Sequence, residues 1–96
     1  MTRVIITRAY LYRLRNEVPF VGLFRKLDWP HKRVGAQLRF VCPICSEHQT
    51  SVNPNTNLAR CFRCQRNWNP IDFTIVTTNC EFLQAVAQLE ELLPNP

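Results

Sequence analysis

The stretch Cys42–Cys64 reads CPICSEHQTSVNPNTNLARCFRC, in which two Cys-x2-Cys pairs enclose fifteen residues. A two-residue gap lets both thiolates of a pair point inward from a tight turn, and a hairpin between the pairs brings the two turns together. This spacing predicts a tetrahedral Zn2+ site, which is structural because four sulfur ligands leave no position for water or substrate. The alternatives to a zinc site are reduced core thiols or disulfides, but unrelated cysteines rarely fall into two matched Cys-x2-Cys pairs. The predicted ligands are Cys42, Cys45, Cys61 and Cys64.

The size of the chain makes a structural metal useful. Its 96 residues suit one domain, which buries only roughly 60–65% of its unfolded surface. Structural zinc adds on the order of 10 kcal/mol of apparent folding free energy, so we expect the cysteine half to lose its fold without metal. The N-terminus shows no secretory signal, and the apolar stretch Val18–Phe24 is too short to span a bilayer. Paired cysteines without an export signal favour a metal site in a reducing, cytoplasmic compartment and no membrane association.

Charge is distributed unevenly along the chain. The formal net charge is +5, with nine Lys/Arg against two acidic residues in 1–40 and three against one in 41–70. Residues 71–96 hold four acidic residues and no base. A Zn2+ ion with four thiolates contributes −2, which lowers the total to about +3. A basic excess on one side is consistent with a polyanionic partner such as nucleic acid, and the alternative is a basic surface that only faces solvent.

Apolar periodicity predicts helices at both ends of the chain. Thr7 is predicted to cap the first helix, and a second apolar face follows Pro19 and ends before Pro30. Asn69 is predicted to cap a third helix with Pro70 at its first position, and Asn79 to cap the last.

The middle of the chain predicts a small antiparallel sheet. Alternating residues over Gln37–Cys42 and Leu58–Phe62, with Ser51–Asn53 between them, indicate three strands, whereas His31–Gly35 is predicted to be a basic turn. The fold class is therefore α+β, a zinc ribbon with a three-stranded antiparallel sheet flanked by helices. The predicted single domain 1–96 divides into a helical N-terminal part (1–36), the ribbon (37–68) and C-terminal helices (69–93).

From about Val18 to Leu93 the chain resembles the zinc-binding domain of bacterial replicative primases, the Cys-His-Cys-Cys zinc finger. Four stretches carry the resemblance in the order of the family: Cys42–Glu47, Cys61–Cys64, Asn69–Phe73 and Asn79–Val86. The resemblance from Val18 to Leu93 covers about four-fifths of the chain. The resemblance implies a module that binds single-stranded template DNA in replication.

The chain departs from the family pattern in three ways. Cys45 stands where the family has a histidine ligand, and thiolate is an equally good zinc ligand. The glycines of the second cysteine turn are replaced, so this turn must use Asn67 in the left-handed region or a different geometry. An acidic catalytic domain does not fit within 96 residues, so the resemblance implies a free-standing module that serves a separate primase, polymerase or helicase, as on a phage, plasmid or integrative element.

Basic and aromatic residues near the cysteines are the candidate nucleic-acid contacts, because arginine binds phosphate while aromatic rings stack on bases. Trp68 is predicted to be exposed, whereas Phe62 is either exposed or packed around the zinc turn. Lys32 and Arg33 either extend the same surface or only face solvent. The candidates are Arg39, Arg60, Phe62, Arg63, Arg66, Trp68, Lys32 and Arg33.

The remaining candidates have weaker support. His48 could replace Cys45 in the zinc shell, and Cys80 is predicted to be a partly buried free thiol. With no acid pair, Ser/His/Asp set or glycine-rich phosphate loop, the sequence predicts no enzyme. A second hypothesis is a protein-interaction adaptor, because Val4–Ile6 with Tyr10 and Tyr12 could pack on a partner or on a second copy as a homo-oligomer. A transcriptional regulator is a third.

Overall fold

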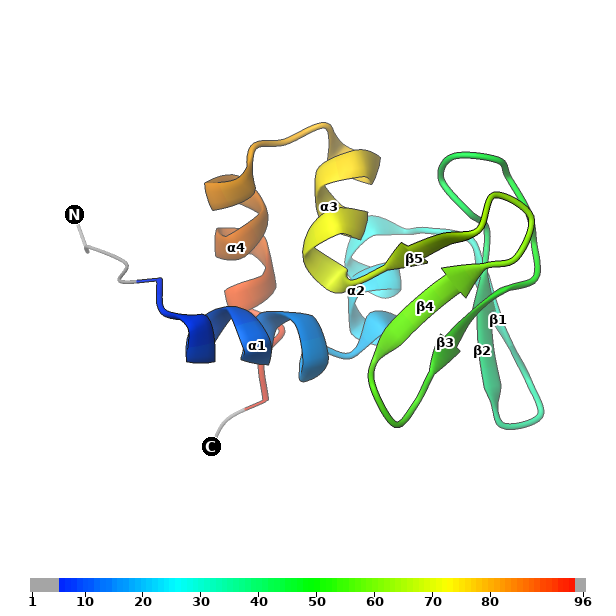
Figure 1. Cartoon of the computed structure of the whole chain (residues 1–96), viewed down its shortest axis with the longest axis horizontal. Coiled ribbons are helices and arrows are strands. Elements are labelled where there is room, and N and C mark those ends of the chain that lie inside the picture. Colours follow the sequence, from blue (N-terminus) through cyan, green and yellow to red (C-terminus); the bar gives the residue numbers. More distant parts are fainter. Residues whose placement is uncertain (1–5, 95–96) are drawn as a thin grey trace.

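The computed structural model describes residues 6–94 of the chain. Four helices and five strands follow in the order α1 (Arg8–Asn16), α2 (Phe20–Leu27), β1 (His31–Val34), β2 (Gln37–Phe40), β3 (Thr50–Asn53), β4 (Leu58–Cys61), β5 (Arg66–Trp68), α3 (Pro70–Thr78) and α4 (Phe82–Glu90). Figure 1 shows the sheet at one end of the molecule and α1, α3 and α4 at the other. Within residues 6–94, no helix has the length and apolar character needed to cross a membrane.

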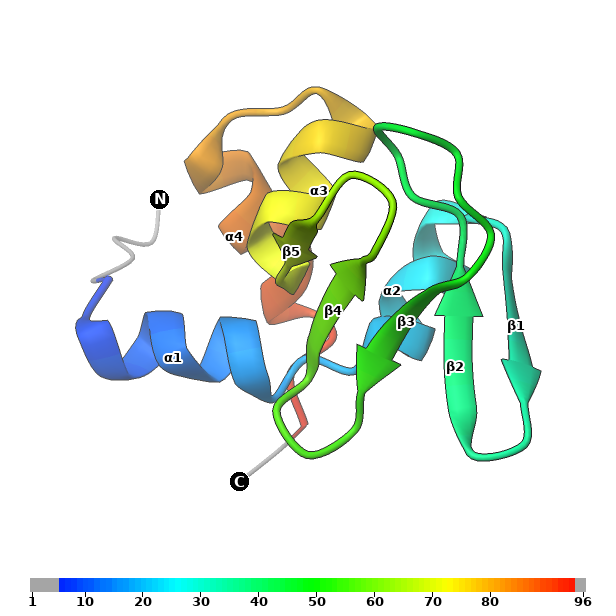
Figure 2. The ribbon, with the colours of Figure 1, turned by 45° about the vertical axis from the view of Figure 1, so that its right-hand side comes forward.

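The sheet is an antiparallel meander whose strands lie in sequence order (Figure 2). This confirms the α+β zinc ribbon, but the sheet has five strands instead of three. The predicted basic turn over His31–Gly35 is wrong, because β1 pairs with β2 and the chain reverses only at Gly35, whose φ is 61°. β1 is an edge strand with all four residues exposed, so it shows no apolar alternation that a sequence pattern could detect.

One aromatic core joins the sheet to the helices. Phe73 of α3 is fully buried, and its ring centroid lies 5.3–6.2 Å from five other aromatic rings. These rings come from α2, from the segment before β1, from β2 and from β5: Phe20, Phe24, Trp29, Phe40 and Trp68. The ribbon and the helical half therefore depend on the same packed centre.

The predicted exposure of Trp68 is wrong, because its side chain is 0% exposed. Trp68 pairs with Ala59 across β4 and β5, and directly paired residues share one face of a sheet. Ala59 is buried, so the same register directs the indole into the core.

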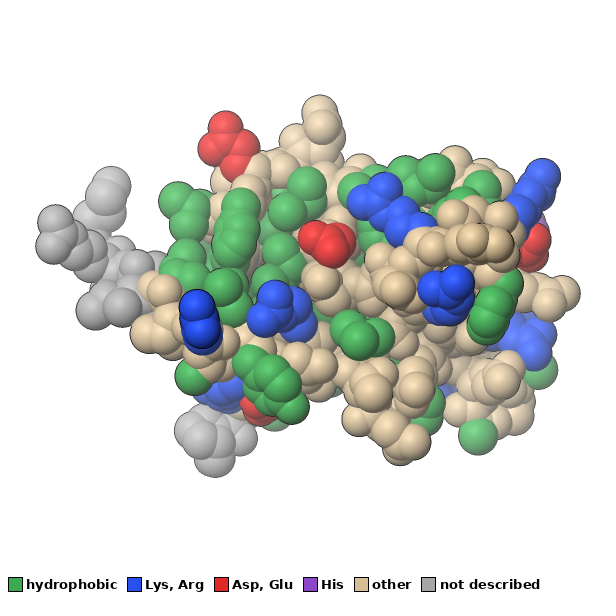
Figure 3. All heavy atoms as spheres, in the orientation of Figure 1, with side chains coloured by type: hydrophobic (Ala, Val, Ile, Leu, Met, Phe, Trp, Pro, Cys, Tyr) green, Lys and Arg blue, Asp and Glu red, His purple; other side chains and the backbone are tan. Residues whose placement is uncertain are grey.

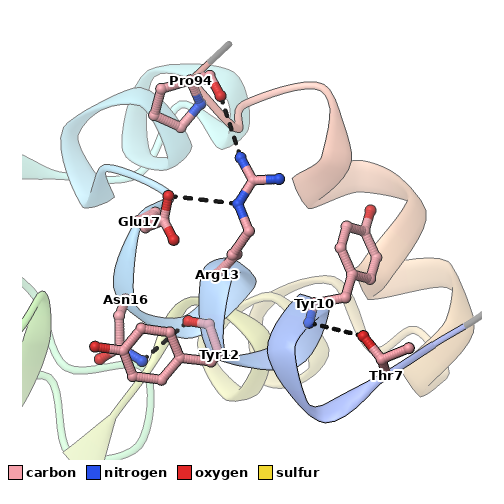
Figure 4. Close-up of polar contacts among 7 residues, drawn as sticks. All are labelled: Thr7, Tyr10, Tyr12, Arg13, Asn16, Glu17 and Pro94. Atoms are coloured by element: carbon pink, nitrogen blue, oxygen red, sulfur yellow. Dashed lines mark hydrogen bonds and ion pairs between the residues drawn. The ribbon is translucent and has the colours of Figure 1, made fainter. Parts of the chain in front are cut away.

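The first helix begins and is anchored by local polar contacts. The Thr7 hydroxyl accepts a hydrogen bond from the Tyr10 backbone N–H at 3.1 Å, which confirms the predicted cap. Figure 4 shows the Arg13 guanidinium reaching both the Glu17 carboxylate and the Pro94 carbonyl, each at 3.4 Å. The segment that follows α4 is thereby tied to α1.

The C-terminal helices begin in two different ways. The Asn69 side chain accepts from the Asp72 N–H at 2.8 Å with Pro70 as the first helical residue, as predicted. The prediction for Asn79 is wrong: it ends α3 in the left-handed region, which asparagine tolerates, with φ 54°. Glu81 instead begins α4, in a capping box with Gln84. Of the predicted apolar segment Val4–Ile6, only Ile6 lies within the described residues, and it packs against the core.

Candidate metal centre and open sheet face

The four cysteines come together at one end of the sheet. Cys42 and Cys45 lie between β2 and β3, Cys61 ends β4, and Cys64 precedes β5. All four sulfur atoms lie within 4.8 Å of one another, with Cys42 Sγ 3.8 Å from Cys64 Sγ and Cys45 Sγ 3.3 Å from Cys61 Sγ. Tetrahedral zinc with Zn–S bonds of about 2.3 Å separates its sulfur ligands by about 3.8 Å. The residues therefore fit Zn2+.

Each cysteine turn closes with a residue in the left-handed region. Ser46 follows the first pair with φ 65°, and Gln65 follows the second with φ 57°. Of the two alternatives left open for the second turn, the structure has the different geometry, because Asn67 lies within β5 and Gln65 takes the left-handed conformation. Gln65 occupies the position of the family's glycine and adopts the glycine conformation despite its side chain.

The thiols of this cluster differ in pKa. Burial and the neighbouring thiols of Cys61 and Cys42 raise the pKa of Cys64 to about 12. Burial acts in the same direction on Cys61, but hydrogen bonds from the Cys64 backbone, the Cys45 thiol and the Thr50 hydroxyl lower the Cys61 pKa to about 6. The cluster thus stabilises one anion at the expense of others, and a divalent cation is what allows all four to ionise.

His48 and Cys80 do not belong to this cluster. Among residues 6–94, the metal-ligand cluster whose ligand atoms all lie within 4.8 Å of one another contains only the four cysteines. The His48 side chain is exposed and is not part of it. Cys80 is partly buried, as predicted, and its thiol faces the Thr74 carbonyl at 3.9 Å.

Thr50 contributes a hydrogen bond to the Cys61 thiol, and sequence reasoning missed it. Its buried hydroxyl could be suspected only from the fact that its strand leads out of the first cysteine turn.

The strand register aligns five polar side chains in one row across the sheet. Successive pairings join Lys32 to Arg39, Arg39 to Ser51, Ser51 to Arg60 and Arg60 to Asn67. Directly paired residues point to the same face, so the row lies on the side opposite the core. We call this side the open sheet face.

Two arginines of the row are held in place by neighbours. The Arg39 guanidinium donates to Gln37 Oε1 at 3.1 and 2.9 Å, and Arg60 donates to Asn67 Oδ1 at 2.9 Å. Arg60 also lies 5.9 Å from the centroid of the Phe62 ring, which is 70% exposed. Of the two alternatives for Phe62, exposed or packed around the zinc turn, the structure shows the exposed one.

Arg63 lies beside a hollow on the same face. This hollow, of about 450 Å³, is lined by Gln37, Glu47, Gln49, Ser51, Phe62 and Arg63. It brings an exposed ring and a cation next to several hydrogen-bonding side chains. Sequence reasoning missed Ser51, Asn67 and Gln37, which only the pairing of the strands could identify.

Three predicted contacts do not belong to the open sheet face. Arg33 pairs with Leu38 and lines a pocket with core residues, so it faces the opposite side from Lys32. Arg66 pairs with Cys61 on the inner side, where its guanidinium lies 4.4 Å from the centroid of the Trp68 ring. Trp68 itself is buried and cannot stack on a base.

Comparison with known proteins gives one result that spans nearly the whole chain. A family model described as the CHC2 zinc finger, the DnaG zinc ribbon, matches residues 6–94. The curated proteins compared with the chain include no match.

Proposed function

Because the chain belongs to the CHC2 zinc-finger family, we propose that it is a non-catalytic module that binds single-stranded template DNA during replication. The observation that supports this most is the row Lys32–Arg39–Ser51–Arg60–Asn67 beside the exposed Phe62 ring. Three cations in a row with two hydrogen-bonding side chains suit a phosphate backbone, and an exposed ring next to them suits a base.

The dimensions of the row suit an extended strand. Neighbouring strands lie roughly 4.8 Å apart, so the four steps from β1 to β5 span about 19 Å. Lys32 stands at one end, Arg39 and Arg60 lie inside, and Phe62 is beside Arg60. A single strand laid across the sheet meets the three cations in turn, while one base stacks on the ring.

The side chains are held in position before the DNA arrives. Gln37 fixes Arg39 and Asn67 fixes Arg60, and each guanidinium keeps further N–H donors for phosphate. Less side-chain freedom is then lost on binding. Zn2+, held by the four thiolates, supplies the rigid ends of the hairpin on which this face is displayed.

The catalytic step belongs to a separate replication enzyme, a primase, polymerase or helicase. This part of the proposal rests on the family, whose zinc ribbon is a module of replication proteins. The module contributes binding and orientation of the template to that enzyme.

Two adjacent residues give a matched test. Lys32→Ala and Arg33→Ala each remove one positive charge from β1, but only Lys32 lies on the open sheet face. Affinity of the zinc-loaded chain for a labelled single-stranded oligonucleotide is measured by fluorescence anisotropy over a series of salt concentrations. We expect Lys32→Ala and Arg60→Ala to weaken binding, and each to reduce the slope of log K against log salt by about 0.7.

The control outcomes are distinct. Arg33→Ala should leave both affinity and slope unchanged. A chain that binds no oligonucleotide at low salt, where electrostatic attraction is strongest, contradicts DNA binding. An equal loss in Lys32→Ala and Arg33→Ala places the interface away from the open sheet face.

A further inference from the structure

The hollow on the open sheet face contains a carboxylate that binding to phosphate does not explain. Glu47 is the only acidic residue in 41–70, and it lines this hollow together with Phe62 and Arg63. Figure 3 shows basic side chains spread over the sheet end of the molecule and an acidic side chain among them at the outer edge. The two ion pairs within residues 6–94 do not include Glu47. An unpaired carboxylate repels phosphate and so weakens binding to DNA of every sequence.

The first cysteine turn holds Glu47 in a fixed position. Its backbone carbonyl accepts hydrogen bonds from the Cys42 N–H and from the Thr50 hydroxyl, each at 3.0 Å. Its side-chain Oε1 accepts a hydrogen bond from the Gln49 N–H at 3.2 Å. A carboxylate has about four lone-pair positions, and this bond uses one of them. The side chain therefore has a local role in the turn and still offers acceptors to the hollow.

The other side chains of the hollow supply a stacking surface and hydrogen-bond donors. The Phe62 ring is 70% exposed, and the exposed Arg63 adds a cationic donor. Gln37 accepts from Arg39 through Oε1, which leaves its amide nitrogen to donate. The volume of about 450 Å³ lies within the range of roughly 300–1,000 Å³ that is typical of ligand pockets. A ring, an acceptor and donors in one hollow are the groups that bind a single unstacked base.

We propose that this hollow binds one unpaired guanine of the DNA strand, an inference that rests on the proposed function. Guanine is the only one of the four DNA bases that presents two neighbouring N–H donors, N1–H and N2–H, beside a carbonyl acceptor, O6. The Glu47 carboxylate accepts from N1–H and N2–H, and the Arg63 guanidinium donates to O6. The Phe62 ring stacks on the purine.

The other bases pair poorly with a carboxylate at this position. Adenine and cytosine each present one amino group beside a ring nitrogen that accepts, and thymine presents one N–H between two carbonyl oxygens. Each of them sets an acceptor against an oxygen of Glu47, and a polar group left without a partner costs affinity. The carboxylate that weakens general binding to DNA therefore increases selectivity between bases.

The test measures the affinity of the full zinc-loaded chain for DNA that differs at one base. Four labelled thymidine oligonucleotides, with guanine, adenine, cytosine or thymine at one central position, are compared by fluorescence anisotropy. We expect the guanine oligonucleotide to bind about tenfold more tightly than the other three. Hypoxanthine in place of guanine lacks the N2 amino group and should lose most of this preference. This measurement uses the unaltered chain and so does not depend on how a variant folds.

Two glutamate variants test the carboxylate itself. Glu47→Gln keeps an oxygen for the Gln49 N–H, but its amide also brings donors against the donors of guanine. It should reduce the preference for guanine to less than about twofold. Glu91→Gln is the matched control, because it removes the same charge from the segment after α4, and it should keep the full preference. The zinc content of both variants is measured alongside, to establish that the metal site is intact.

The outcomes separate this inference from the proposed function. Equal affinity for all four oligonucleotides overturns the guanine site and leaves DNA binding intact. A preference for another base overturns it as well, and so does a guanine preference that survives in Glu47→Gln. A chain that binds none of the oligonucleotides at low salt contradicts the proposed function and the guanine site together.

Discussion

At the scale of single residues, Gln65 shows how a cysteine turn can close without glycine. Its φ of 57° lies in the left-handed region, which costs a residue with a side chain roughly 1–2 kcal/mol. The surrounding turn enforces this conformation because Cys61 and Cys64 must both face the metal. Local strain of this kind persists only where the surrounding structure fixes the backbone.

Replacing Gln65 by glycine should therefore stabilise the protein. We expect Gln65→Gly to raise the free energy of unfolding by about 0.5–1 kcal/mol, the relief of strain less the greater freedom of glycine in the unfolded chain. Denaturant unfolding at fixed free zinc measures the change. Asn67→Gly, in a strand, is the control and should destabilise. A loss of stability in Gln65→Gly would contradict this explanation of the turn.

Two aromatic residues near the metal have opposite roles. Trp68 is 0% exposed, whereas Phe62 is 70% exposed. We expect Trp68→Ala to lower the free energy of unfolding by about 3–5 kcal/mol, because it leaves a large cavity in the core. Phe62→Ala should change it by less than about 0.5 kcal/mol while weakening DNA binding. Urea denaturation of both variants measures the difference, and similar losses in the two would contradict the assigned burial.

At the scale of elements, the sheet sorts its side chains by alternation. Lys32 and Arg33 are neighbours in sequence, but β1 directs them to opposite faces. Arg60 and Arg66 are separated in the same way, one on each side of the β4–β5 pair. These basic residues, alike in composition, are thus divided between the open sheet face and the core side of the sheet.

The contact between α1 and α4 gives a prediction for alkaline pH. Burial and the neighbouring Glu90 carboxylate raise the pKa of Tyr10 from its ordinary value of 10.0 to about 12. Between these values the unfolded chain loses the proton that the folded chain keeps, so this contribution to stability is complete below about pH 10 and is lost as pH rises toward 12. Thermal unfolding of wild type and Tyr10→Phe from pH 9 to about 12 measures it.

Tyr10→Phe should show a shallower loss of stability over this range, since it has no phenol to ionise. Tyr12→Phe, on the same helix but 59% exposed, is the control and should follow the wild type. If the stability of Tyr10→Phe and of the wild type falls equally with pH, ionisation of the Tyr10 phenol does not contribute to the alkaline loss of stability.

At the scale of the whole molecule, the ribbon and the helices share the aromatic centre around Phe73. Loss of zinc frees the cysteine turns and with them β2 and β5, which supply Phe40 and Trp68 to that centre. We therefore expect a chelator to unfold both halves together, because structural zinc contributes on the order of 10 kcal/mol.

Two signals measured in parallel test this cooperativity. Helical circular dichroism reports mainly on α1 to α4, and tryptophan fluorescence reports on Trp29 and Trp68. Both should change with the same dependence on chelator concentration and recover when zinc is restored. Helical signal that persists after fluorescence has changed would mean that the helical half folds on its own.

The sequence by itself determined the zinc site, the family and the order of helices and ribbon. Cysteine spacing, proline positions and apolar periodicity are local properties, and they act through turns and helix ends only a few residues long. The tertiary structure decided the rest. The strands β1 and β5 form by pairing with neighbours, and they show no alternation of their own.

The face on which each side chain lies was likewise decided only in three dimensions. Register, which depends on partners far apart in the chain, aligned Lys32 with Arg60 and turned Arg33 and Trp68 away from them. Composition identifies which residues could bind DNA, but only the pairing of strands places them side by side, because a shift of one residue moves every side chain to the other face.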